Sequence, residues 1–203
     1  GHTVEVISGQ PYPILDEGVK LTKLPSLDLY SYDSPLKAFK FKLLKKPIDL
    51  YEWLSHLSGG FSEPYTFGER MAVWGKTNYN RFDVVHDNQT LAYGLIKLRD
   101  MGVPVVGTIH HPITMDKRID IKHAETLSLK ILKWRWYSFL KMQIKVARQL
   151  DPIIVVSENT RKDVVKDFKI DRKKTRKVLH GIDHKTFEPI PSIKRKKNQL
   201  ITT

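Results

Sequence analysis

The chain contains no cysteine among its 203 residues. A disulfide framework and a metal site with thiolate ligands are therefore excluded. It also lacks an apolar run long enough to span a bilayer, and its amino end carries no secretory signal. With 40% hydrophobic and 10% aromatic residues, the composition is that of a globular protein. These features lead us to expect a cytoplasmic protein.

Acidic residues are scarce relative to basic ones. The 22 Asp and Glu residues are outnumbered by 35 Lys and Arg residues, which gives a formal net charge of +13. Such an excess favours anionic partners, namely phosphates, sugar nucleotides, acidic lipid surfaces or nucleic acid. The basic residues are dispersed and no nucleic-acid-binding motif accompanies them, so we expect no nucleic-acid partner.

The two ends of the chain indicate a fragment of a longer protein. The sequence opens with Gly1 and His2 rather than Met, and residues 200–203 are typical of a strand that is just beginning. We therefore expect further segments on both sides of this chain.

Strand-like and helix-like segments alternate along the sequence. Apolar or β-branched runs predict strands at 3–8, 19–24, 83–86, 103–109, 153–156 and 176–179. Caps and breakers predict helices at 35–45, 49–57, from 66 onward, at 89–100, from about 123 to 150, and from a cap at Ser157 or Asn159 to 168. This alternation predicts an α/β fold with a Rossmann-like, doubly wound, mainly parallel sheet.

Polar residues follow four of the predicted strands. In open α/β sheets, ligands bind beyond the carboxyl ends of the strands, so these residues are candidates for a binding site. Three of the four clusters contain histidine, although the chain has only 8 histidines. The candidates are His86, Asp87, Asn88 and Gln89, then His110 and His111, then Ser157 and Glu158, and finally His180 and Gly181.

Each candidate also has a structural interpretation. His110 could hydrogen-bond a sugar hydroxyl or stabilise charge near a reacting centre, or it could merely tie down a turn. Asp87 and Asn88 suit acceptor hydroxyls, but both also suit the cap of the following helix, which we favour for Asn88. Ser157 has no nucleophile-elbow glycines around it, so we expect it to cap a helix.

A metal site is not expected. His86, His110 and His111 show no tight ligand spacing such as HExxH. Adjacent histidines in an extended segment also point in different directions.

Residues 129–146 (LKILKWRWYSFLKMQIKV) combine aromatic and basic side chains. The helical spacing of Ile131, Trp134, Ser138 and Met142 predicts a face that packs on the sheet. Peripheral contact with an anionic membrane is the alternative.

Four sequence motifs occur together in one order and spacing. They are FDVVH at 82–86, GVPVVGTIH at 102–110, IIVVSE at 153–158 and VLHGIDHKTF at 178–187. Together with the opening GHTVEVIS, this set resembles glycosyltransferase family 4 over most of the chain except residues 24–80. The resemblance implies half of a GT-B fold, in which two Rossmann-like domains face a cleft. It also implies retaining transfer from a nucleotide sugar, without a metal or other cofactor.

The resemblance assigns a role to each candidate. Residues 1–190 would form the amino-terminal, acceptor-side domain, and 191–203 the linker and the start of a carboxyl-terminal donor domain. His110 matches the histidine that lies against the donor sugar near the reacting carbon. The acceptor pocket would be lined by His86, Asp87, Asn88, Gln89 and His111, and the donor side of the cleft by Ser157, Glu158 and Gly181.

The sequence departs from the family pattern in three places. The family's first strand with its glycine-rich loop, and the whole donor domain, are not present, so the chain should be inactive alone. His180 stands where the family usually has asparagine, which leaves its role open. The expected partners are a nucleotide sugar, a sugar, lipid or small-molecule acceptor, and the inner face of a membrane. A sugar-nucleotide epimerase or phosphorylase of the same fold is one alternative. A non-catalytic basic module for anionic lipid or nucleic acid is the other.

Overall fold

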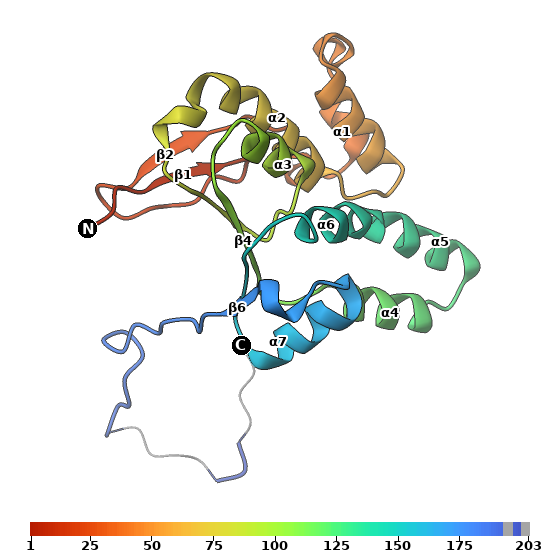
Figure 1. The fold of residues 1–203 in the computed structure, drawn as a ribbon. Helices are drawn as coiled ribbons and strands as arrows, with labels where there is room; N and C mark the ends of the chain where they lie inside the picture. Colours follow the sequence, from red (N-terminus) through yellow and green to blue (C-terminus); the bar gives the residue numbers. More distant parts are fainter. Residues whose placement is uncertain (193–196, 200–203) are drawn as a thin grey trace.

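The computed structural model describes residues 1–192 and 197–199 and confirms an α/β fold with parallel sheets (Figure 1). One sheet pairs β1 (Glu5–Ser8) with β2 (Lys20–Lys23). The second has the order β3-β4-β5-β6, with strands Val85–Asn88, Val105–Ile109, Ile153–Val155 and Thr175–Lys177. Every pairing in both sheets is parallel. The Rossmann-like character is thus confirmed, although among the described residues the strands form two sheets rather than one.

Helices connect β2 to β3 and the successive strands of the larger sheet. They are α1 (Pro47–Leu57), α2 (Glu63–Asn78), α3 (Tyr93–Asp100), α4 (Thr114–His123), α5 (Leu127–Trp136), α6 (Leu140–Ala147) and α7 (Glu158–Asp163). Short 3-10 helices occupy Leu29–Ser31, Pro35–Ala38, Phe41–Lys45, Tyr79–Arg81, Tyr137–Phe139 and Arg172–Lys174, and a π-helical turn covers Val164–Phe168. The predicted strand at 200–203 and most of the predicted linker at 191–203 lie outside the described residues.

Several predicted helices were wrong in type or extent. Residues 35–45 form two 3-10 helices, because the chain is extended at Phe39 and Lys40. The long helix predicted from 123 to 150 is interrupted by the 3-10 turn at Tyr137–Phe139. The segment before it, for which no helix was predicted, contains α4. Helix α2 begins at Glu63 rather than 66, with Pro64 in its first turn, where a missing N–H costs nothing.

The main core lies around β4 and β5. Val105 and Ile109 of β4 are buried, as are Ile153 and Val155 of β5. Helices α2, α3 and α6 contribute apolar side chains to the same cluster. Strands covered on both faces read as continuous apolar runs, which is why these strands could be recognised from the sequence.

The backbones of helices α2 and α3 come into direct contact where the helices cross, because each helix has a glycine at that point. A Cβ atom on Gly94 would collide with the carbonyl oxygen of Gly68, and one on Gly68 would collide with the side chain of Ala92. The absence of a side chain at both positions therefore sets how closely the two helices pack.

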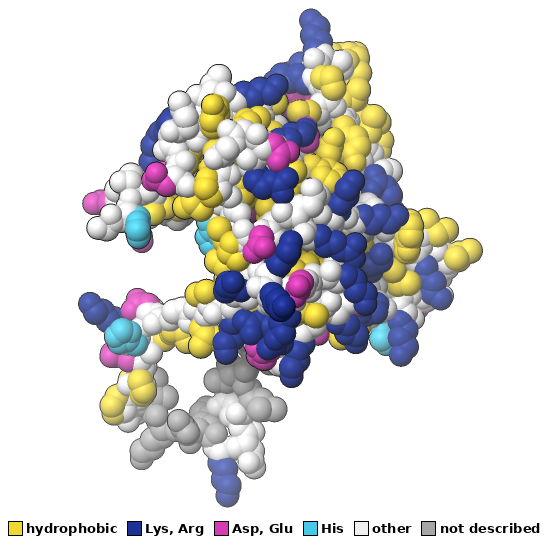
Figure 2. Space-filling view, viewed as in Figure 1, with side chains coloured by type: hydrophobic (Ala, Val, Ile, Leu, Met, Phe, Trp, Pro, Cys, Tyr) yellow, Lys and Arg dark blue, Asp and Glu magenta, His cyan; other side chains and the backbone are white. Residues whose placement is uncertain are grey.

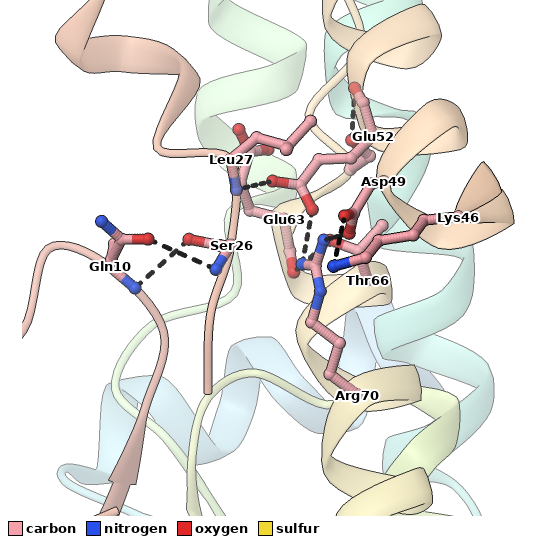
Figure 3. Close-up of polar contacts among 10 residues, drawn as sticks. Gln10, Ser26, Leu27, Lys46, Asp49, Glu52, Glu63, Thr66 and Arg70 are labelled. Carbon is pink, nitrogen blue, oxygen red and sulfur yellow. Dashed lines mark hydrogen bonds and ion pairs between the residues drawn. The ribbon is translucent and has the colours of Figure 1, made fainter. Parts of the chain in front are cut away.

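A buried ion-pair network ties α1 and α2 to the loop that follows β2 (Figure 3). Arg70 of α2 lies 2.7 Å from Asp49 Oδ1 and 2.5 Å from Glu52 Oε2, both on α1. The other oxygen of Glu52 accepts a hydrogen bond from the backbone N–H of Leu27 at 3.0 Å. Glu52 is 1% exposed, so its charge depends on Arg70 for compensation.

Replacing Arg70 with methionine should destabilise the protein by about 3–5 kcal/mol, because Glu52 would keep a buried charge without its cation. Chemical denaturation measures the loss. Lys46→Ala is the matched control, since Lys46 lies 3.8 Å from Asp49 with an exposed side chain. That control should change stability by less than about 1 kcal/mol. Equal effects of the two substitutions would contradict the importance of the network.

Candidate functional site

His110 lies directly after β4, at the carboxyl edge of the larger sheet. Its Nε2 is 2.6 Å from Asn88 Oδ1, at the end of β3. Its Nδ1 is 3.2 Å from Nε2 of His180, which follows β6, and the two rings are tilted with centroids 5.1 Å apart. Both ring nitrogens of His110 are therefore engaged by groups from other strand ends.

The side chain of Gln89 fixes the backbone around His110. Its Oε1 accepts from the N–H of His110 at 2.6 Å, and its Nε2 donates to the carbonyl oxygen of His111 at 2.7 Å. Gln89 itself has a φ of 64°, in the left-handed region that non-glycine residues rarely adopt. Gln143 of α6 donates to the carbonyl oxygens of Gln89 at 3.0 Å and Thr90 at 3.3 Å. The loop after β3 is thus held from both sides.

The backbone of His110 is also held by a hydroxyl group from α7, the helix that follows β5. Thr160 Oγ1 donates to the carbonyl oxygen of His110 at 3.0 Å. The same hydroxyl lies 2.9 Å from Oγ of Ser157, which caps α7 by accepting from the N–H of Thr160 at 3.0 Å. The predicted capping role of Ser157 is confirmed.

The surroundings of His110 favour the uncharged form of its ring. Partial burial lowers its pKa below the ordinary value, and the nearby imidazoles of His180, His111 and His86 lower it further. Because Asn88 Oδ1 is an acceptor, the single ring proton of the neutral form lies on Nε2. Nδ1 then carries the lone pair and faces His180.

Asp87 is buried beneath the same loop. Its carboxylate accepts from the N–H of Leu91 at 2.9 Å and is 6% exposed. Burial raises the pKa of Asp87 to about 6, against the lowering effect of hydrogen bonds from Leu91 and Thr90. The structure places Asp87 as a support of the loop rather than on its surface.

Asn88 does not cap the following helix, so that expectation was wrong. Helix α3 begins only at Tyr93, and Ala92 occupies its cap position. The left-handed backbone at Gln89 and Leu91 turns the chain before the helix can start. Asn88 Oδ1 is thereby left to contact His110.

The remaining candidates lie around this cluster. Nε2 of His86 is 2.6 Å from Oγ1 of Thr108, and the exposed His111 is 3.3 Å from Asp116. Glu158 forms ion pairs with Arg172 at 2.7 Å and Arg161 at 3.1 Å, and the hydrogen bond from Arg172 is the main cause of its lowered pKa. Gly181 is exposed and next to His180.

Metal ligands do not gather at this edge in the part of the chain that the structure describes. No three His, Asp or Glu side chains form a group there that could hold an ion. The metal-independent reaction remains a prediction.

The basic aromatic segment is arranged differently from the sequence prediction. Met142 is buried, as expected, but Ile131 is 62% exposed and Trp134 is 54% exposed. The packing prediction was wrong for these two residues, because the turn at Tyr137–Phe139 separates α5 from α6. Helix α5 packs on α4 instead, and the pair projects from the sheet (Figure 1).

The sequence reasoning missed Thr160 and Gln143 as parts of the site. Thr160 carried no signal, since it lies inside a predicted helix. Gln143 did carry one, because it is a polar residue flanked in α6 by Leu140, Met142, Val146 and Ala147, all of which are buried. A buried amide on an apolar helix face requires hydrogen-bond partners, and these turned out to be the carbonyls of the loop.

These features define a Rossmann-like domain with a polar site at the carboxyl ends of its parallel strands. The family model for Glycosyltransferase Family 4 matches residues 1–186, and the chain belongs to this family. One relative is the MMP alpha-(1->4)-mannosyltransferase of Mycolicibacterium hassiacum, which is 43% identical over 190 residues. The match covers 93% of this chain and 46% of that relative, so the chain spans about half the relative's length.

Replacing Asp87 with asparagine should remove a pH dependence of stability. Because the pKa of Asp87 is raised from 3.8 to about 6, the folded state holds this proton more tightly than the unfolded chain. The resulting stabilisation is complete below the ordinary pKa and is lost as pH rises through about 6. Between about pH 4 and pH 7, the wild type should lose about 2 kcal/mol relative to Asp87→Asn, measured by chemical denaturation. A constant difference over that range would refute the assignment.

Proposed function

We propose that this chain is the acceptor-binding half of a retaining glycosyltransferase. The enzyme transfers a hexose from a nucleotide sugar to a sugar, lipid or small-molecule acceptor. The observation that carries the proposal is the convergence of Asn88, Gln89, His110 and His180 at the carboxyl edge of the larger sheet. Family membership supports the same chemistry.

The proposed role of His110 follows from the fact that its surroundings favour the neutral form of the imidazole. Glycosyl transfer develops positive charge at the anomeric carbon of the donor sugar. A cationic histidine beside that carbon would oppose the reaction, whereas a neutral imidazole can hydrogen-bond the sugar without doing so. The lowered pKa of His110 supports this role.

The remaining candidate residues at the carboxyl edge of the sheet are assigned either to the acceptor or to the donor sugar. His86, Asp87, Asn88, Gln89 and His111 belong to the acceptor side, where Asp87 acts by holding the loop. Ser157, Glu158 and Gly181 belong to the donor side. The leaving phosphate deprotonates the acceptor, so transfer requires neither a carboxylate from this chain nor a metal or other cofactor.

The proposal includes a second, donor-binding domain outside this chain, without which the chain is inactive. The matched relative is about twice as long as the match, which supports this division. That relative is called an alpha-(1->4)-mannosyltransferase, and from this we propose mannose as the sugar transferred.

The proposal is tested by a donor screen on the complete protein, including every segment that flanks this chain. We expect nucleotide release from a nucleotide sugar to depend on an acceptor. His110→Ala should lower kcat by about 10²-fold or more, with a loss of stability of only about 1 kcal/mol. His123→Ala is the control, because His123 lies at the end of α4 and, among the described residues, its ring forms a hydrogen bond only with the carbonyl oxygen of Ile119.

Three outcomes would contradict parts of this proposal. If no nucleotide sugar is bound or turned over, sugar transfer is refuted. If the donor sugar is isomerised without an acceptor, the epimerase alternative holds. If His110→Ala loses activity only in proportion to its fall in melting temperature, His110 has a structural role alone.

We also propose that the exposed side of α5 contacts an anionic membrane. Among the described residues, no helix is long and apolar enough to cross a membrane. Yet α5 exposes a group of large apolar side chains next to lysines and arginines, at the right of Figure 2. The exposed apolar residues are Leu127, Leu129, Ile131, Leu132 and Trp134. Apolar side chains beside basic ones are typical of helices that lie on anionic lipid surfaces.

Vesicle flotation tests this contact. The complete protein should float with vesicles containing about 30% phosphatidylglycerol and much less with phosphatidylcholine alone, because the attraction is partly electrostatic. The double substitution Ile131→Ser with Trp134→Ala should abolish flotation. Val73→Ser should leave it unchanged, since Val73 is similarly exposed but lies on α2. Equal flotation of the two variants would rule out α5 as the contact.

A further inference from the structure

A cavity of about 380 Å³ lies apart from the His110 cluster, between α1, the start of α2 and α3, and the α5–α6 junction. Its volume falls within the range of about 300–1,000 Å³ that is usual for small-molecule sites. Tyr93 and Met142 are part of its wall. Met142 directly precedes Gln143, whose side chain donates to the carbonyl oxygen of Gln89 in the loop that positions His110.

One wall of the cavity holds an arginine in a fixed orientation. The guanidinium of Arg135 donates to the hydroxyls of Ser138 at 3.0 Å, Ser55 at 3.0 Å and Ser58 at 3.1 Å. It lies flat against Gly60, where any Cβ atom would collide with it. Three neutral acceptors and a glycine thus position the cation before any ligand is present.

The positive charge of this wall has no counterion within the described part of the chain. Arg135 forms no ion pair there, in contrast to Arg70, which is matched by two carboxylates. Lys141, which also lines the cavity, forms no ion pair either and lies 4.9 Å from the ring centroid of Trp134. A half-buried arginine without a carboxylate partner, beside an exposed lysine, creates a site that favours an anion.

The opposite side of the cavity is aromatic and carries unpaired hydroxyls. The rings of Tyr51 and Tyr65 meet edge to face with their centroids 5.2 Å apart. The rings of Tyr65 and Tyr93 also meet edge to face, with their centroids 6.5 Å apart. Within the described residues, none of these three phenol groups has a hydrogen-bond partner in the protein. Phe61 adds a further ring to the wall. Aromatic faces with free hydroxyls suit the apolar faces and hydroxyl groups of a sugar ring.

We propose that this cavity binds an acidic sugar, meaning a sugar that bears a phosphate or a carboxylate. Arg135 and Lys141 contact the acidic group, and the tyrosines contact the sugar ring. The inference goes beyond the transfer reaction, because it concerns a separate site and requires no donor. Binding is measured without a donor, so its failure would leave the proposed transfer activity untouched.

The test compares four probes by calorimetry on the complete protein. They are mannose 6-phosphate, glucuronate, mannose and inorganic phosphate. Either the phosphorylated sugar or the sugar carboxylate should bind at least about tenfold more tightly than both mannose and inorganic phosphate, since only it meets both walls. Which of the two binds more tightly identifies the acidic group. Added salt should weaken this binding.

Variants assign the binding to this cavity. Arg135→Gln should weaken binding of the acidic sugar by about tenfold or more. Because Arg135 also links α5 to α1, Lys141→Gln provides a second variant that breaks no hydrogen bond or ion pair in the described residues, and it should weaken binding about threefold to tenfold. Lys130→Gln is the matched control, since Lys130 is an exposed lysine of α5 that does not line the cavity.

Two results would overturn the proposal. One is mannose binding as tightly as the acidic sugars, which would make the cations irrelevant. The other is Lys141→Gln and Lys130→Gln giving the same affinity as the wild type, which would place the binding elsewhere.

Discussion

The amide of Gln89 is the contact on which the geometry of the site depends. It bridges two consecutive residues of the turn after β4, so the direction in which His110 leaves the sheet follows from the position of one side chain. Gln89 has an unfavourable left-handed backbone, of the kind that persists only when its surroundings fix it. Gln143 and the buried Asp87 supply that support from α6 and β3. The catalytic candidate is therefore rigid because its loop is held by buried polar groups.

Charge is distributed unevenly over this basic protein. At the strand edge, partial burial and the neighbouring imidazoles lower the pKa of His110, which favours the neutral form of its ring. Inside the α1–α2 contact, Arg70 is matched by two carboxylates and stabilises the fold. At the cavity beside α5, Arg135 is held by hydroxyls and forms no ion pair among the described residues. The same kind of side chain thus serves packing in one place and recognition in another.

The strands and the strand edge could be predicted because their signals are local. The buried strands are short runs of β-branched residues, and the polar residues that follow each run meet at one edge in any parallel sheet. Helix α4 could not be predicted, since none of its residues is buried and it therefore carries no apolar stripe. The spacing of Ile131 and Trp134 showed that they share a helix face but not that the face points away from the core. The contact of His110 with His180 joins residues 70 positions apart, and no local pattern encodes it.

The pair of glycines at the crossing of α2 and α3 restricts how this protein can change over evolutionary time. A methyl group at position 68 or 94 would push the helices apart, and α2 carries the arginine that anchors α1 and the loop after β2. A substitution at either glycine would therefore also displace α1 and the loop after β2, which neither glycine touches. The two positions are therefore coupled. A larger residue at either position is excluded as long as the other helix stays where it is.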